Sequence, residues 1–176
     1  NNTVIINLIN ANSPMVFDET MLGALKVYAR NNQACIVTPF ILAGAMSPIT
    51  IGGSLVQQNA EALAGIVLGQ CAARGAPIFY GHFTSNVDMR TGAPAFGTPE
   101  YAKSVIASAQ MARRYGLPIR SSNTTASACV DLQATYESDM SIMACVQGHI
   151  NVMMHAGGWL EGGLTCSFEK LILDAE

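Results

Sequence analysis

Five short apolar runs, rich in Val and Ile, recur along the chain between longer segments with helical periodicity. The runs occupy residues 3–9, 34–38, 77–81, 117–121 and 151–155, and turn-forming residues bound each of them. They predict β-strands, and their nearly continuous apolar character is typical of parallel strands covered on both faces. The repeat is 31 to 42 residues when measured between Ile5, Ile36, Ile78, Ile119 and Val152. This spacing is that of successive βα units.

Helix start signals precede the intervening segments. These signals are Asp18, Ser54 with Gln57 as a capping box, the run Thr98-Pro99-Glu100, a start near Ser127 for a helix to Gln147, and a last start near Ser167. Two helices share one ending, a last-turn arginine followed by Gly75 or Gly116 and then a proline two residues later. Glycine can adopt the left-handed conformation that ends a helix, and proline blocks its continuation. A helix-then-strand unit is therefore repeated.

The repeated unit leaves two α/β architectures open, a doubly wound sheet and part of a TIM (β/α)8 barrel. No glycine-rich turn of the dinucleotide-binding kind follows the first strand, which favours the barrel. A complete barrel takes about 250 residues, and this chain has 176. We therefore expect parallel βα units in a single domain, residues 1–176, that is an incomplete segment of a longer TIM-barrel chain. If the chain ended at Glu176, the open sheet edges would favour a homo-oligomer.

The composition raises the question of a membrane protein, because 12% of the residues are charged and the mean hydropathy is +0.30. Residues 31–60 carry no charge, but prolines, a Gly-Gly pair and several Asn and Gln residues interrupt them, so we reject a span. A net charge of −3 without a basic cluster argues against nucleic acid and anionic membrane surfaces as partners. The five cysteines show no C-x-x-C spacing, which predicts buried, reduced thiols and a cytoplasmic protein.

Long connections point to the functional region. Residues 39–53 and 82–97 follow two of the expected strands, and a glycine-rich segment, residues 155–163, follows the last one. Long ordered connections usually carry function, and the active site of a barrel is built from segments after the carboxyl ends of its strands. We therefore look for functional residues in these three segments.

Four motifs carry a resemblance to a known family. They are VDMRTGAPAFGTPE (87–100), RRYGLP (113–118), QATYES (133–138) and HAGGWLEGGLTCSFEK (155–170). Through them the chain resembles the trimethylamine methyltransferase family, the corrinoid-dependent methylamine and betaine methyltransferases. The resemblance implies a (β/α)8 barrel that passes a methyl group from a tertiary or quaternary amine to the Co(I) corrinoid (a cobalamin-type cofactor) of a partner protein. Some family members contain pyrrolysine, whereas this chain has only standard residues and is similar to the branch that demethylates quaternary amines such as glycine betaine.

Aromatic residues are the first candidates for binding such a substrate. A quaternary ammonium has no proton to donate, so aromatic faces and nearby carboxylates must recognise it. Phe40, Tyr80, Phe83, Phe96 and Trp159 fall at or just past the expected strand ends and are compatible with a cage. We take Phe40, Tyr80, Phe83 and Trp159 as substrate-binding candidates, with Trp159 foremost. The alternative for each phenylalanine is packing in the core.

Charged and polar residues in the same segments are candidates for the reaction itself. Asp88 and Glu161 can supply a negative field near the cation, and His155 or Arg90 can meet a substrate carboxylate. The alternatives are an Asp88–Arg90 ion pair that fixes the loop, a solvated carboxylate at Glu161, and a core histidine at position 155. No general base is required when cobalt is the nucleophile and the amine leaves neutral.

Other chemistries are weaker. A zinc site at Cys145, His149 and His155 lacks a third ligand with defined spacing, so we expect no metal site. A lyase or aldolase needs a Schiff-base lysine, and all three lysines lie on expected helices. A non-catalytic module that binds quaternary ammonium ions with the same cage remains the alternative to an enzyme.

Overall fold

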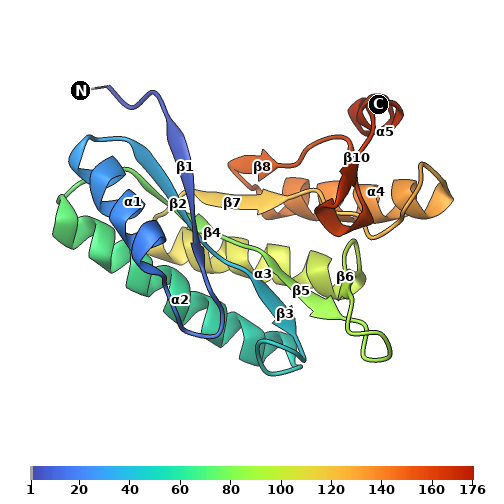
Figure 1. Ribbon diagram of the computed structural model, residues 1–176, viewed down its shortest axis with the longest axis horizontal. Coiled ribbons are helices and arrows are strands. Elements are labelled where there is room, and N and C mark those ends of the chain that lie inside the picture. Colours follow the sequence, from blue (N-terminus) through green and yellow to red (C-terminus); the bar gives the residue numbers. More distant parts are fainter. Residues whose placement is uncertain (1) are drawn as a thin grey trace.

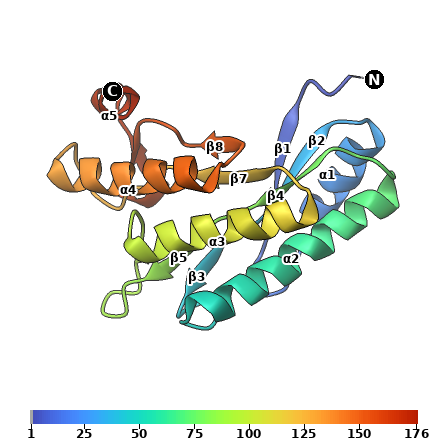
Figure 2. The ribbon, with the colours of Figure 1, turned by 180° about the vertical axis from the view of Figure 1, so that it is seen from behind.

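The computed structural model describes residues 2–176, and a five-stranded parallel sheet organises them (Figures 1 and 2). The sheet contains, in spatial order, β1 (Ile6–Ala11), β2 (Ala34–Pro39), β4 (Ile78–Gly81), β7 (Ile119–Ser122) and β8 (Val152–Met154). The strands lie side by side in the order in which the chain visits them, whereas a doubly wound sheet reverses that order. The structure is therefore a half-barrel, and the expected α/β class with part of a TIM barrel is confirmed.

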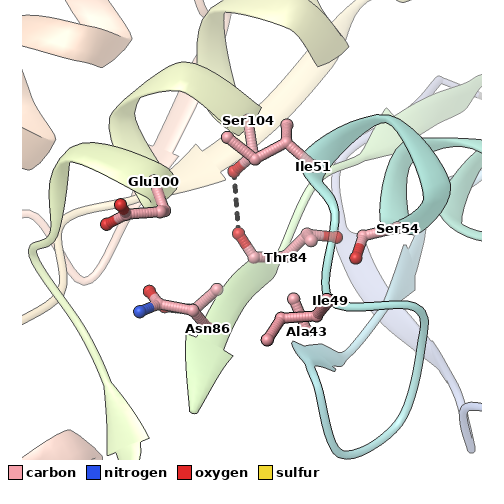
Figure 3. A pocket seen from close by; sticks show the side chains of 9 residues that line it. Ala43, Ile49, Ile51, Ser54, Thr84, Asn86, Glu100 and Ser104 are labelled. Carbon is pink, nitrogen blue, oxygen red and sulfur yellow. Dashed lines mark hydrogen bonds between the residues drawn. The ribbon is translucent and has the colours of Figure 1, made fainter. Parts of the chain in front are cut away.

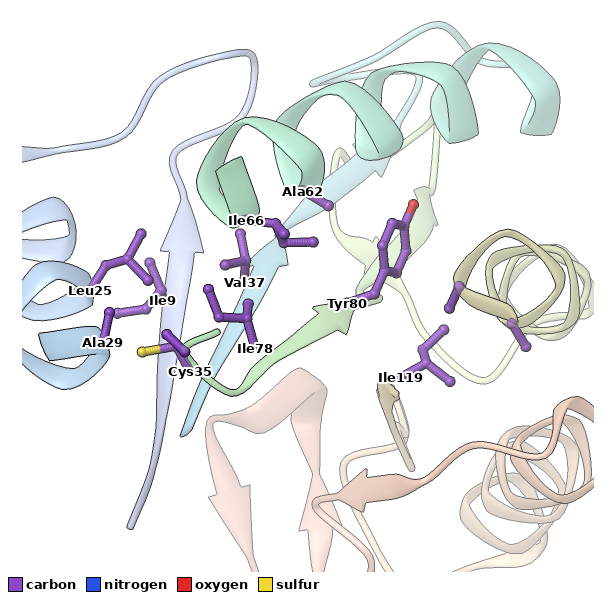
Figure 4. Packing of buried hydrophobic residues seen from close by; sticks show 13 residues of the cluster. Ile9, Leu25, Ala29, Cys35, Val37, Ala62, Ile66, Ile78, Tyr80 and Ile119 are labelled. Atoms are coloured by element: carbon purple, nitrogen blue, oxygen red, sulfur yellow. The ribbon is translucent and has the colours of Figure 1, made fainter. Parts of the chain in front are cut away.

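Helices cover the outer face of the sheet. They are α1 (Glu19–Arg30), α2 (Ile51–Ala72), α3 (Pro99–Tyr115) and α4 (Leu132–Gly148). The short α5 (Phe168–Ala175) packs on α4 and on one of the last short strands. Alternate side chains of β1, β2, β4 and β7 point toward these helices and form the main apolar core (Figure 4), and a smaller apolar cluster joins α3, α4 and β8. Strand residues in the main core include Ile9, Val37, Ile78, Tyr80 and Ile119. The intervening strand residues point to the inner face, which is where a barrel places its functional side chains.

Three of the expected helix starts are confirmed. The carboxylate of Asp18 accepts a hydrogen bond from the amide of Met21 at 2.8 Å. The hydroxyls of Thr98 and Ser167 cap α3 and α5 in the same way. Gly116 ends α3 with a positive φ of 67°, a conformation that glycine adopts without the steric cost of a Cβ.

The start of α2 differs from the expectation. The helix begins at Ile51, and the hydroxyl of Thr50 caps it by accepting from the amide of Gly53 at 3.2 Å. Ser54 lies inside the first turn, and its hydroxyl donates back to the Pro48 carbonyl at 2.7 Å. A Cβ at position 53 would lie 2.7 Å from the Pro48 ring, so glycine lets the preceding loop close against the helix.

The start of α4 is also later than expected, at Leu132 instead of Ser127. Asp131 caps the helix by accepting from the amide of Ala134 at 2.8 Å, and it holds the Ser127 hydroxyl at 2.9 Å. Ser127 therefore belongs to the connection. The strand ends also shift, most of all in β1, which begins at Ile6 and not at residue 3.

The long connections contain short strands that the sequence analysis missed. A second sheet has the order β3-β5-β6, formed by β3 (Ile41–Ala43), β5 (Thr84–Val87) and β6 (Pro94–Ala95). A hairpin joins β9 (Trp159–Leu160) and β10 (Thr165–Cys166). These pairings order the segments beyond the carboxyl ends of the main strands.

The exposure of the cysteines differs from the expectation that all five are buried. Cys35 and Cys145 are buried, but Cys71, Cys129 and Cys166 are exposed, so the prediction of buried thiols is wrong for three of the five. All five are free thiols. Within residues 2–176, none of the helices has the length and apolar character needed to cross a membrane.

Candidate functional site

A pocket of about 180 Å³ opens on the inner face of the half-barrel, at the carboxyl ends of the strands. Its lining comes from β1, β2, β7 and the segments after β2, β4 and β8, and consists of Leu8, Asn10, Thr38, Phe40, Phe83, Arg120, His155 and Trp159. Small-molecule sites are typically concave, largely apolar and supplied with a few polar groups. This pocket has that composition and lies where a barrel holds its ligand.

The aromatic residues of the pocket form a contiguous group. The rings of Phe40 and Phe83 stack with centroids 5.2 Å apart, and Phe83 lies 6.4 Å from Trp159. Phe83 is buried, whereas Phe40 and Trp159 are half-buried. The latter two can therefore present ring faces to a ligand, while Phe83 supports them from behind, and Phe96 lies 6.0 Å from Trp159 outside the lining.

Trp159 is held in place by the connection after β7 and by its own hairpin. The indole Nε1 donates to the Thr125 carbonyl at 3.0 Å, and the Thr125 hydroxyl donates to the Trp159 carbonyl at 2.6 Å. A Cβ at position 163 would lie 2.7 Å from the indole ring, so Gly163 permits the close packing of the hairpin. The ring is therefore positioned before any ligand arrives, which lowers the ordering cost of binding.

His155 is a neutral neighbour of the indole. Its ring centroid is 4.3 Å from that of Trp159, and its Nδ1 lies 3.1 Å from the hydroxyl oxygen of Ser122. Burial, and then the positive charge of Arg120, lowers the pKa of His155 to about 4. The imidazole is therefore uncharged at neutral pH and does not repel a cation in the pocket.

Arg120 is a pocket residue that the sequence analysis missed. It lies on β7, its side chain is 1% exposed, and its Cζ lies 5.3 Å from the centroid of Phe83. Its Nη1 donates to the His82 carbonyl at 3.2 Å, while its Nε has no partner among the described residues. The sequence held a signal, because a lone arginine inside a short strand must point to one face of the sheet.

Tyr80 does not reach this pocket. It shares the outward face of β4 with Ile78, and its hydroxyl points toward α2 (Figure 4). There it accepts from the side-chain amide of Gln58 at 3.3 Å, and burial raises its pKa to about 12. Tyr80 is therefore a core residue in this structure and takes no part in the aromatic group around Trp159.

The charged candidates Asp88, Arg90 and Glu161 are exposed and lie outside the pocket lining. The carboxylate of Asp88 accepts from the backbone amide of Arg90 at 2.8 Å, and this hydrogen bond lowers its pKa. The two side chains form no ion pair, in contrast to the alternative drawn from the sequence. Glu161 accepts from the hydroxyl of Thr165 at 2.5 Å and faces a separate surface depression. Of the three catalytic candidates, His155 alone lines the pocket.

A second, small cavity lies between the start of α2 and the start of α3 (Figure 3). Its volume is about 20 Å³, enough for roughly one water molecule. One of its lining residues, Ser104, donates to the Thr84 carbonyl at 2.8 Å. Its size and internal hydrogen bonding fit a structural void. Among residues 2–176 no group of three or more His, Cys, Asp or Glu side chains is arranged to hold a metal ion.

Comparison with protein families gives one match over the chain. The model of the trimethylamine methyltransferase (MTTB) family matches residues 1–176. The chain belongs to this family. The motifs at residues 87–100 and 155–170 lie on the connections that carry Phe83, His155 and Trp159 of the aromatic pocket, or directly follow them.

Curated relatives of this MTTB chain include both betaine and amine methyltransferases. It is 44% identical over 174 residues to a glycine betaine methyltransferase of Desulfitobacterium hafniense, covering 98% of this chain and 36% of that protein. It is 35% identical to a trimethylamine methyltransferase of Methanosarcina mazei, covering 83% and 30%. It is 32% identical to a proline betaine:corrinoid methyltransferase of Eubacterium limosum, covering 93% and 34%. The chain thus spans about a third of the length of these relatives.

Proposed function

We propose that this chain forms the amine-binding part of a methyltransferase that moves a methyl group from a quaternary or tertiary amine to the Co(I) corrinoid of a partner protein. The observation that carries the proposal is the aromatic pocket at the carboxyl ends of the strands of an MTTB half-barrel. Relatives named for betaines, trimethylamine and a corrinoid support this reaction class. The five free thiols support a reducing, cytoplasmic setting as part of the proposal.

The pocket residues bind and orient the methylated nitrogen. Phe40 and Trp159 offer the negative faces of their rings to the cation, and Phe83 packs behind Phe40. Leu8, Phe40, Phe83 and Trp159 supply the apolar part of the lining, which lowers the local dielectric and strengthens electrostatic attraction in the pocket. The neutral ring of His155 packs beside Trp159 without adding a like charge.

The pocket leaves one end of a bound amine open to a partner protein. A pocket of about 180 Å³ has the size for a small amine, and a corrinoid carried by a partner protein would reach the amine through the pocket opening. The reduced corrinoid supplies the nucleophile in such a transfer. The pocket then holds the N–CH₃ bond toward the opening, and the electron pair of the broken bond stays on nitrogen. A quaternary substrate therefore leaves as a neutral amine, with no proton transfer by the protein.

The test is to mix the full-length protein with a reduced corrinoid carrier and one amine at a time. Methyl transfer predicts the appearance of methyl-Co(III) in the visible spectrum with at least one betaine or methylamine. Calorimetric binding of the same amine without any methyl-Co(III) would instead identify a non-catalytic quaternary-ammonium module. The corrinoid carrier without the protein is the matched blank.

A further inference from the structure

The side of the pocket formed by β7 contains a positive charge that the proposed amine-binding role does not explain. Arg120 is 1% exposed and lines the cavity, so its guanidinium faces the pocket and not bulk solvent. Burial lowers its pKa to about 10, which still leaves it protonated at neutral pH. A methylated ammonium would share about 180 Å³ with this like charge, and unit charges repel strongly at such short range.

No side chain in the described part of the chain neutralises this charge. The ion pair found within residues 2–176 joins Lys170 to Asp174, away from the pocket. Tyr101 and Cys145 lie within electrostatic range of Arg120, but burial raises their pKa values to about 12 and 11, so both are neutral. A buried guanidinium without an anion costs several kcal/mol. The pocket therefore favours a ligand that brings its own negative charge.

Two unsatisfied polar atoms lie in the lining of the same pocket. The Nε of Arg120 and the hydroxyl oxygen of Thr38 are buried, and neither has a hydrogen-bond partner among residues 2–176. Buried polar atoms in folded proteins are nearly always satisfied. An N–H group and a hydroxyl donor can together hold the two oxygens of a carboxylate.

We propose that Arg120 and Thr38 bind the carboxylate of the methyl donor, so that the pocket selects carboxylated quaternary amines (betaines) over amines without a carboxylate. This inference rests on the proposed function and names its substrate class. The Arg120 guanidinium lies against Phe83, and Phe83 stacks on Phe40. Arg120 can therefore bind the anionic end of a small zwitterion while the neighbouring aromatic rings bind its cationic end. The substrate carboxylate screens the ammonium from Arg120.

Binding experiments separate this claim from the methyl-transfer reaction. The probes are glycine betaine, tetramethylammonium, and 3,3-dimethylbutanoate, in which carbon replaces the nitrogen of glycine betaine and the carboxylate remains. Calorimetry compares the wild-type protein with Arg120→Gln, Arg120→Lys and Thr38→Val. The exposed Arg74, outside the pocket lining, provides the matched control Arg74→Gln.

We expect Arg120→Gln to weaken both carboxylated probes about 10- to 150-fold, the range for a lost hydrogen bond to a charged group. Tetramethylammonium should bind this variant at least as well as it binds the wild type. Arg120→Lys keeps the charge but loses the planar fork, so its losses should be smaller. Thr38→Val should weaken the carboxylated probes alone.

Equal losses for all three probes in Arg120→Gln would overturn the inference and make Arg120 a structural residue. Unchanged thermal stability of Arg120→Lys keeps the test valid if Arg120→Gln folds poorly. Arg120-dependent binding of 3,3-dimethylbutanoate without methyl transfer from any amine would support the carboxylate site and overturn the proposed function. Methyl transfer from tetramethylammonium in preference to glycine betaine would support the proposed function and overturn the carboxylate site.

Discussion

Replacing the indole of Trp159 tests whether the pocket recognises positive charge or apolar shape. Trp159→Leu keeps an apolar side chain but removes the aromatic face, whereas Trp159→Phe keeps a face. Both variants lose the Nε1 hydrogen bond to Thr125, which is 3.0 Å long in the structure. That shared loss costs about 1 kcal/mol of folding stability and cancels when the two variants are compared.

The magnitude follows from the position of the ring. Trp159 is half-buried and packs against His155 with centroids 4.3 Å apart, so a cation on its open face is partly desolvated. Such a cation–π contact is worth about 1–2 kcal/mol, equivalent to about a 5- to 30-fold change in Kd. Trp159→Leu should therefore lower the affinity for glycine betaine by about this factor, and Trp159→Phe by less.

The assay is calorimetric titration of each variant with glycine betaine and with its uncharged-head isostere 3,3-dimethylbutanoate. A cation–π contact acts on the charged head alone. The affinity for glycine betaine divided by the affinity for 3,3-dimethylbutanoate should therefore fall in Trp159→Leu, and fall less in Trp159→Phe. If both ligands lost affinity by one common factor in Trp159→Leu, the ring would contribute packing alone and the pocket would not recognise positive charge through it.

Three further predictions concern stability and the surface charges. A Cβ at Gly81 would lie 2.1 Å from the Thr38 hydroxyl, so Gly81→Ala should lower the free energy of unfolding by about 1–3 kcal/mol in urea titrations. The helical Gly23 has open space around it, so Gly23→Ala should raise the free energy of unfolding by about 0.5–1 kcal/mol. Burial, followed by the charge of Arg120, lowers the pKa of His82 to about 3; its neutral form therefore adds stability above pH 6.5 that is lost as the pH falls from 6.5 toward 3, at up to about 1.4 kcal/mol for each pH unit. His82→Gln should flatten that part of the stability profile, and an unchanged slope would show that other groups produce it. Arg90→Gln should leave the affinity for glycine betaine within about twofold of wild type, because this exposed side chain lies outside the pocket; a larger, betaine-specific loss would return Arg90 to the site.

The sequence was sufficient for the βα framework because strand and helix signals are local. Continuous apolar runs and side-chain caps such as Asp18 and Thr98 depend on a few neighbouring residues. The second sheet escaped prediction because its strands have two to four residues, too short to show a period. The start of α2 was misplaced because Thr50 and Ser54 both have capping chemistry, and packing of Gly53 on Pro48 decides between them.

The site was predicted in part for a related reason. Phe40, Phe83, His155 and Trp159 were predicted because they follow strand ends, where a barrel gathers its functional groups, and all four line the pocket. The sequence did not show which face of the sheet Tyr80 occupies, because strands covered on both sides have no polar face that would distinguish inside from outside. Arg120 was missed because it lies within a strand, and only the register of β7 turns it toward the pocket.

Locating the methyl groups of bound glycine betaine tests the aromatic site most directly. Intermolecular nuclear Overhauser effects can be recorded between the N-methyl protons of glycine betaine and the protein, with the Trp159 indole assigned from the Trp159→Phe variant. We expect contacts from the N-methyl protons to the rings of Trp159 and Phe40, both of which line the pocket. Contacts to exposed surface residues such as Met89 or Leu164, with none to these two rings, would contradict it.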